Sequence, residues 1–149
     1  MMQKLFCHAS VVGVAVTVLM TPAIAQEETI LLVELAQSAT ISDGVLTLHG
    51  VDDTVLWFSD RPIRDTGEVA LATLIEAWGE GEDSFADDPP NAVLTGMGDE
   101  EEVAIVVELT EPSFEDGALS FGYVALADDR QGEFTNVSLF IDGQVSSLF

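Results

Sequence analysis

Short apolar runs of strand length recur through most of the sequence, and turn-forming residues separate them. Asp43-Gly44 and Asp116-Gly117 each stand between two such runs, as Asp-Gly pairs do in tight hairpins. Several runs place apolar residues at alternate positions, which is typical of strands with one buried face. The pattern predicts a mainly β domain, an antiparallel sandwich or barrel, with strands over 29–36, 45–49, 55–58, 92–95, 103–109, 119–126, 135–141 and 145–149. Glu111-Pro112 is interpreted as the end of one run, and Asp142-Gly143 as the turn into the last strand.

One segment departs from the strand pattern. Four apolar residues follow the spacing i, i+3, i+4, i+7, which marks one face of a helix: Leu71, Leu74, Ile75 and Trp78. We therefore expect one helix over about 68–78, inserted after the third strand, with Gly79 at its end. Polar loops precede it and follow it, and both Trp57 and Trp78 are expected in the core, where they dock the helix onto the sheet.

The N-terminus has the three parts of a secretory signal peptide. Lys4 supplies the positive charge, residues 5–20 form an apolar run, and Ala23-Ile24-Ala25 offers the small residues that a signal peptidase recognises. The alternative, a retained membrane anchor, needs about 20 strongly apolar residues, and the run is shorter. We expect cleavage after residue 25, no membrane insertion afterwards, and one β-rich domain over 26–149. The signal is typical of bacteria, so the expected location is periplasmic or secreted.

The charge balance of residues 26–149 excludes several classes of function. Their only cations are Arg61, Arg64 and Arg130, against 27 acidic residues in the chain. Nucleic acid is therefore not an expected partner, because its binding requires a basic face. Cys7 is the only cysteine and lies within the signal, so no disulfide, thiol nucleophile or cysteine-ligated metal is expected in the domain. The acidity is interpreted as a means of solubility, with specific cation binding as the alternative.

Two blocks in the middle of the chain resemble a family of small exported proteins. The first runs from Leu46 to Val51 and on to Trp57-Phe58-Ser59-Asp60-Arg61-Pro62, and the second is Asp83-Ser84-Phe85-Ala86-Asp87-Asp88-Pro89-Pro90-Asn91-Ala92, with Trp78 between them. The shared signature is FSDRP…W…DSFADDPPNA, and it covers about a third of the chain. The resemblance implies export and a compact β-rich domain. It implies no reaction, because the family has no established activity.

Polar residues of the two central loops are the candidate ligand-binding residues. Arg61 and Arg64 bracket Pro62, and two guanidinium groups in an anionic protein are suited to a carboxylate or phosphate ligand. The competing interpretation is structural: the arginines pair with Asp60, Asp65 or acids of the 80–91 loop and pin the two loops together. The remaining candidates are Asp60, Asn91 and His49. A lone histidine on a strand is more often hydrogen-bonded to a loop than catalytic, and no complete catalytic set is found.

The acidic loop that follows the helix is the candidate metal site. It carries five carboxylates separated by small residues, and hard cations such as Ca²⁺ prefer several oxygens on a bendable loop: Glu80, Glu82, Asp83, Asp87 and Asp88. The spacing differs from that of an EF-hand. A plain solvated loop is the competing interpretation, and no other cofactor is expected.

Two functions follow from these observations. The first is an exported, non-catalytic binding or accessory domain whose ligand is an unknown protein or small molecule. The second is a calcium-dependent or carboxylate-based hydrolase, since a pair of carboxylates at a suitable separation is the catalytic set of many glycoside hydrolases. In a chain with 27 acids such a pair is expected by chance, so we favour the binding domain.

Overall fold

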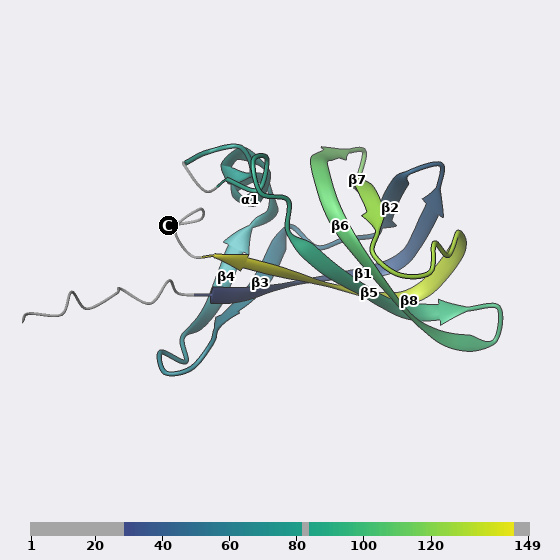
Figure 1. Cartoon of the computed structure of the whole chain (residues 1–149), viewed down its shortest axis with the longest axis horizontal. Helices are drawn as coiled ribbons and strands as arrows, with labels where there is room; N and C mark the ends of the chain where they lie inside the picture. Colours follow the sequence, from purple (N-terminus) through teal and green to yellow (C-terminus); the bar gives the residue numbers. More distant parts are fainter. Residues whose placement is uncertain (1–28, 82–83, 145–149) are drawn as a thin grey trace, which may run out of the picture.

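The fold is mainly β, as the alternating runs predict. The computed structural model describes residues 29–81 and 84–144. They form one antiparallel sheet of eight strands and one short helix (Figure 1). The elements are β1 (Thr29–Ser42), β2 (Val45–His49), β3 (Thr54–Ser59), β4 (Thr66–Ala70), α1 (Leu71–Ala77), β5 (Asn91–Gly98), β6 (Glu101–Glu115), β7 (Ala118–Ala125) and β8 (Gly132–Gln144).

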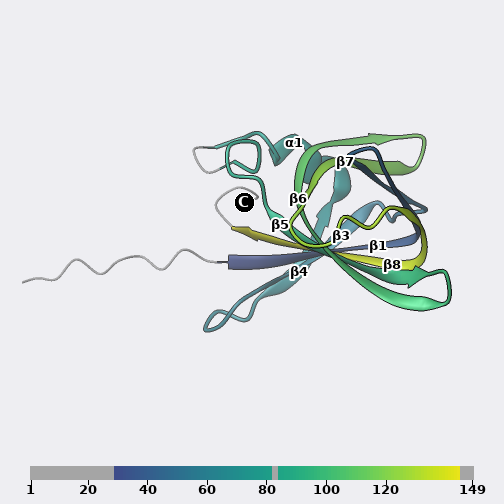
Figure 2. The same cartoon turned by 45° about the vertical axis from the view of Figure 1, so that its right-hand side comes forward.

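Six of the strands pair in a closed ring. Following the pairings, β1 leads to β2, β7, β6, β5 and β8, and β8 pairs with β1 again. The strands curve around a common interior (Figure 2). The inward residues are mostly aliphatic and largely buried, among them Leu46, Leu94 and Leu139. Closing the sheet on itself removes most unpaired edges and surrounds the core with backbone hydrogen bonds.

Strand β1 holds the ring and the remaining hairpin together. One of its edges pairs with β8 from Thr29 to Ile41. The other edge is shared: Ile30–Val33 pair with β3, and Ser38–Ser42 pair with β2. The β3–β4 hairpin therefore extends the sheet beyond the ring, and β4 is its outermost strand.

The β1–β8 pair bends in the middle. The inward residues of β1 have even numbers up to Ala36 and odd numbers from Ala39 onward. On β8 the same change of alternation occurs between Phe134 and Val137. Gln37 and Asn136 stand opposite each other there, and Asn136 has a φ of 51°. Since the side-chain period of a strand is two, only a local irregularity of this kind allows one face to stay inward on both sides of the bend.

Helix α1 and the segment after it cover one end of the ring. The helix contacts β4 and β6 and is followed by Trp78, whose ring centroid lies 5.6 Å from that of Phe121 and 4.8 Å from that of Phe85. Phe85 also packs on β8, because a Cβ at Gly143 would lie 2.8 Å from its ring. Trp78 is a core residue, as expected, and Trp57 packs partly buried against the core. With seven residues, the only helix in the described part of the chain is too short to cross a membrane.

Three local expectations were wrong. The helix begins at Leu71 rather than 68, because residues 66–70 pair with β3 as a strand instead. Glu111-Pro112 does not end its strand: β6 continues to Glu115 through an irregularity, with Glu111 at a φ of 45°. Asp142-Gly143 is not a turn, since both residues pair with β1 inside β8.

The strand expected over 145–149 lies outside the described residues. Asp43-Gly44 and Asp116-Gly117 do form tight turns, with positive φ at all four residues.

The Phe85 contacts lead to a stability prediction. Phe85 is 4% exposed between Trp78 and Gly143, so Phe85→Ala leaves a cavity at the covered end of the ring. We expect the free energy of unfolding in urea to fall by about 3 kcal/mol. The control is Phe114→Ala, at a position 39% exposed, which should change it by less than about 1 kcal/mol. Equal losses for both variants would contradict the assigned packing.

Candidate functional site

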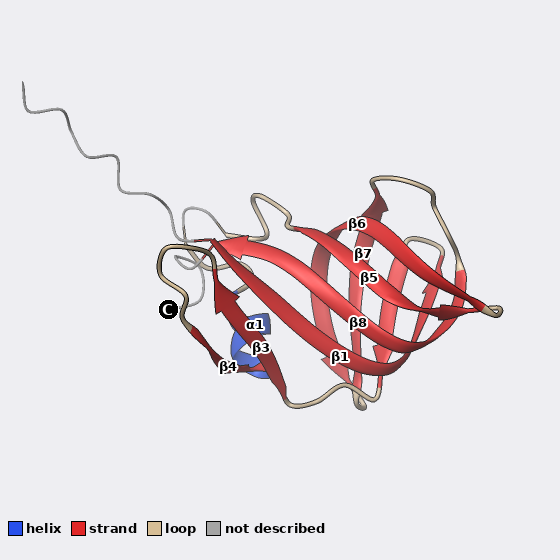
Figure 3. Ribbon diagram, turned by 90° about the horizontal axis from the view of Figure 1, so that it is seen from below, coloured by secondary structure: helices blue, strands red, loops and turns tan. Residues whose placement is uncertain are grey.

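A line of apolar side chains crosses the outer surface of the sheet. The strands β3, β1, β8, β5 and β6 lie side by side in this order (Figure 3). Directly paired residues of neighbouring strands point to the same face. One such line of paired residues is apolar on every strand, and we call it the outer row: Leu56, Val33, Phe140, Val93 and Val106.

The outer row is open to solvent. Leu56, at its β3 end, is 43% exposed, and the other four members are half-buried. Their inward neighbours, such as Leu32 and Leu94, are fully buried. The sheet therefore has apolar residues on both faces along this line, and no part of the described chain covers the outer one. Contiguous exposed apolar surface on a small domain marks an interaction site more often than an accident of sequence.

A small hollow with two carboxylates borders the row on one side. Leu31 stands between Phe58 and Asp142 in the adjacent line of paired residues. These three residues and Asp60 line a cavity of about 240 Å³, together with the first residues of β1. Phe58 is 44% exposed, so the hollow has an apolar wall beside the acids. We call it the Asp142 hollow.

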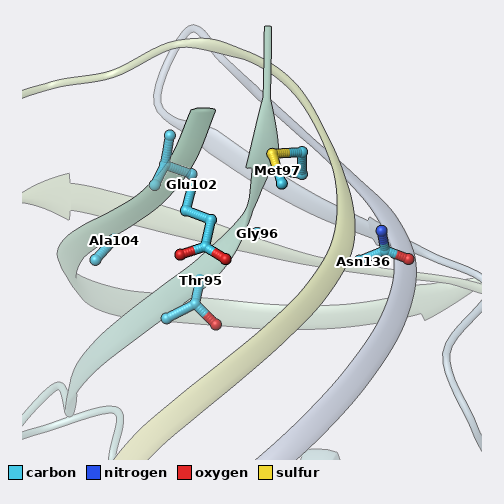
Figure 4. Close-up of a pocket in the computed structure, with 7 residues that line it drawn as sticks. Thr95, Gly96, Met97, Glu102, Ala104 and Asn136 are labelled. Carbon is cyan, nitrogen blue, oxygen red and sulfur yellow. The ribbon is translucent and has the colours of Figure 1, made fainter. Parts of the chain in front are cut away.

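A second hollow borders the row on the opposite side. It has a volume of about 660 Å³ and lies where the pairing of β5 with β8 shifts between Thr95 and Met97. Figure 4 shows the Glu102 carboxylate and the Thr95 side chain on one side of this hollow, with Asn136 set apart from them. Local irregularities of a strand often accompany functional sites because they redirect side chains. We call it the Glu102 hollow.

The charges around the outer row are all negative on the described strands. The line of paired residues that contains Asp142 of β8 continues to Glu108 of β6, which pairs with Asn91 of β5. Glu68 stands beside Leu56 on β4. Together with the two hollows, these acids flank the apolar strip along both of its long sides and at its β4 end, with no cation among its paired neighbours.

The structure brings together some of the predicted ligand-binding residues. Asp60 lines the Asp142 hollow, and Asn91 begins β5 in the neighbouring line of residues. Arg61 and Arg64 lie beyond Asp60 in the β3–β4 connection, exposed to solvent. No described carboxylate lies within 4.0 Å of either guanidinium, so the expected pinning of the two loops has no support among the described residues.

His49 lies away from the other candidates. It pairs with Ser38 of β1, whereas Ser59, next to Asp60, pairs with Ile30. Eight residues of one strand separate these positions, which corresponds to about 26 Å. The His49 ring is exposed and lies 3.4 Å from the hydroxyl of Thr40 on the neighbouring strand β1.

The candidate metal site is only partly described. Glu82 and Asp83 lie outside the described residues, and Glu80 and Asp88 are exposed. The Asp87 carboxylate accepts a hydrogen bond from the buried Ser84 hydroxyl, which gives it a structural role in the loop. Among the residues that the structure describes, no three histidine, cysteine or acidic side chains gather around a possible metal position.

Sequence reasoning missed a buried acid. Glu34 points into the ring from β1 and is 1% exposed, and neither carboxylate oxygen makes a hydrogen bond of good geometry in the described structure. Glu34 lies between the part of β1 that pairs with β3 and the part that pairs with β2. Burial, and to a lesser extent the negative charge of Asp52, raise the pKa of Glu34 from 4.5 to about 7, while the nearby backbone N–H groups of Asp52 and Leu35 partly oppose the rise. Glu34 was hidden within the run TILLVELA; its even position among inward aliphatic residues was the available signal.

The comparisons with known proteins leave the site to be interpreted from its geometry. No protein-family model, curated protein or solved structure matches this chain. The described residues therefore supply two features that demand an explanation: the outer row with its acidic surroundings, and the buried Glu34.

The buried acid predicts a pH dependence of stability. Because the pKa of Glu34 is higher in the fold than its ordinary value, the folded state binds more protons, and stability falls as pH rises from about 4.5 to about 7. The full shift corresponds to roughly 3 kcal/mol. We expect urea unfolding at pH 5 and pH 8 to show this loss in the wild type and not in Glu34→Gln, which keeps the shape and removes the charge. Equal losses in both proteins would contradict the assignment to Glu34.

Proposed function

We propose that this protein is an exported, non-catalytic binding or accessory domain that binds its partner on the outer row. The partly exposed apolar line across five strands carries the proposal. A protein with 27 acids has ample polar surface, yet the sheet keeps Leu56, Phe140 and their neighbours in a continuous strip. Such a strip favours aggregation of the free protein, so a binding role explains its presence.

The features of residues 1–25 support export of the domain to the periplasm or the medium of a bacterial cell. A positive charge, an apolar run and a small-residue end stand in the order of a signal peptide. The resemblance to a family of small exported proteins, carried by the FSDRP and DSFADDPPNA blocks, points the same way and stays a prediction.

The alternative, a calcium-dependent or carboxylate-based hydrolase, has less support from the described residues. Glu34 has the raised pKa that a general acid needs. It is buried among aliphatic side chains inside the ring, however, and at 1% exposure a substrate does not reach it. The exposed acids of the 80–91 loop lack a described group of three that would hold a metal ion.

Position-specific cross-linking tests the binding face. A photoreactive amino acid is placed at Leu56 on the row and, in a control protein, at Phe114, which is similarly exposed but lies at the far end of β6. The full-length chain is expressed in the cells that make it and irradiated. We expect one discrete adduct from position 56 and none from position 114.

A second substitution shows whether the adduct depends on the row. Val93→Asp puts a charge on the outer row three strands away from the cross-linker and should abolish the adduct at position 56. The proposed function is overturned if positions 56 and 114 give the same adducts, or if the adduct survives Val93→Asp in a protein with an unchanged melting temperature.

A further inference from the structure

The carboxylates around the outer row restrict which kind of partner can bind there. Asp60, Asp142 and Glu108 lie along one side of the row, Glu102 along the other, and Glu68 at its β4 end. A partner that covers the apolar strip must bring its own polar rim close to these carboxylates. A neutral or acidic rim would leave them desolvated and unpaired, which is costly.

The described cations do not neutralise this rim from within the chain. Arg130 pairs with Glu101 near the start of β6. Arg61 and Arg64 are exposed in the β3–β4 connection, and neither lies within ion-pair distance of Asp60 or Asp142. The acids around the row therefore remain available to cations from outside.

The overall charge selects against a second copy of the same chain. The formal net charge is −23, and two outer rows placed face to face would bring two acidic rims together. Repulsion of this kind keeps strongly charged proteins monomeric and speeds their association with partners of opposite charge. A basic partner gains from the same field that disfavours self-association.

We propose that the outer row docks a cationic amphipathic segment of another protein. This inference rests on the proposed function and adds the chemistry of the partner. The five strands span about 19 Å across the row at the usual strand spacing. An amphipathic helix of about 13 residues has this length. Its apolar stripe covers the row, and lysine or arginine side chains on its two flanks reach the Asp142 hollow and Glu102.

Three synthetic peptides test the assignment with the purified protein. The first has 14 residues, with leucine at helical spacing on one face and lysine on the flanks. The second keeps the leucines and replaces lysine by glutamate, and the third keeps the lysines and replaces leucine by serine. We expect the leucine–lysine peptide to bind at least tenfold more tightly than either of the others in calorimetric or fluorescence titrations at 50 mM salt.

Matched variants locate the binding. Asp142→Asn with Glu108→Gln should weaken the leucine–lysine peptide at least fivefold. Glu115→Gln with Asp116→Asn removes the same charge at the β6–β7 turn and should weaken it less than twofold. Leu56→Gln should weaken binding at least fivefold, and Phe114→Gln should not. Melting temperatures confirm that each variant is folded.

Several results overturn the inference. Equal affinity for the leucine–lysine and serine–lysine peptides, or equal effects of the two charge pairs, would indicate attraction by net charge alone. A concentration-dependent dimer that dissociates on Val93→Asp would assign the row to a second copy. Specific cross-links at position 56 without preference for the cationic peptide would leave the proposed function standing and exclude this partner.

Discussion

The pairing of β1 with three other strands is the constraint on which the rest of the structure depends. Its edge toward β8 is occupied throughout, and its other edge is divided between β3 and β2. The half that pairs with β2 closes the ring, and the half that pairs with β3 carries the hairpin beyond it. Because residues 29–144 contain no cysteine, no disulfide joins these strands, and the backbone pairings and the core that they enclose hold them together.

The division of β1 also explains the position of Glu34. Between Val33 and Ser38 one edge of the strand has no strand partner, and the connection from β2 to β3 passes beside it. A carboxylate at this seam is buried by the ring while lying near Asp52. The stability of the fold is thereby linked to the protonation of Glu34 at the point where the sheet divides. The neighbouring negative charge of Asp52 favours the neutral form of Glu34.

Acidity and apolar surface act together on the outside of the sheet. An exposed strip such as the outer row invites sheet-to-sheet contact, whereas surrounding carboxylates make contact between identical molecules unfavourable. The same arrangement leaves a basic amphipathic partner as the chemistry that satisfies both the strip and its rim. Solubility and selectivity for a basic partner thus arise from the same distribution of charge. The composition gives only the large negative net charge and not the positions of the acids.

The sequence by itself determined the mainly β class, the turns at Asp43-Gly44 and Asp116-Gly117, the one helix and the strongly anionic character, because these depend on local periodicity and on composition. It misplaced the start of α1 and the supposed turn at Asp142-Gly143, since tertiary pairing with β3 and β1 overrides local preference there. Of the site, Asp60 and Asn91 were found as polar loop residues. The outer row was not, although its members stand in runs that are apolar on both faces. Only the tertiary structure decided which face of each run is buried and which residues of distant strands stand side by side, because register is a property of the assembled sheet.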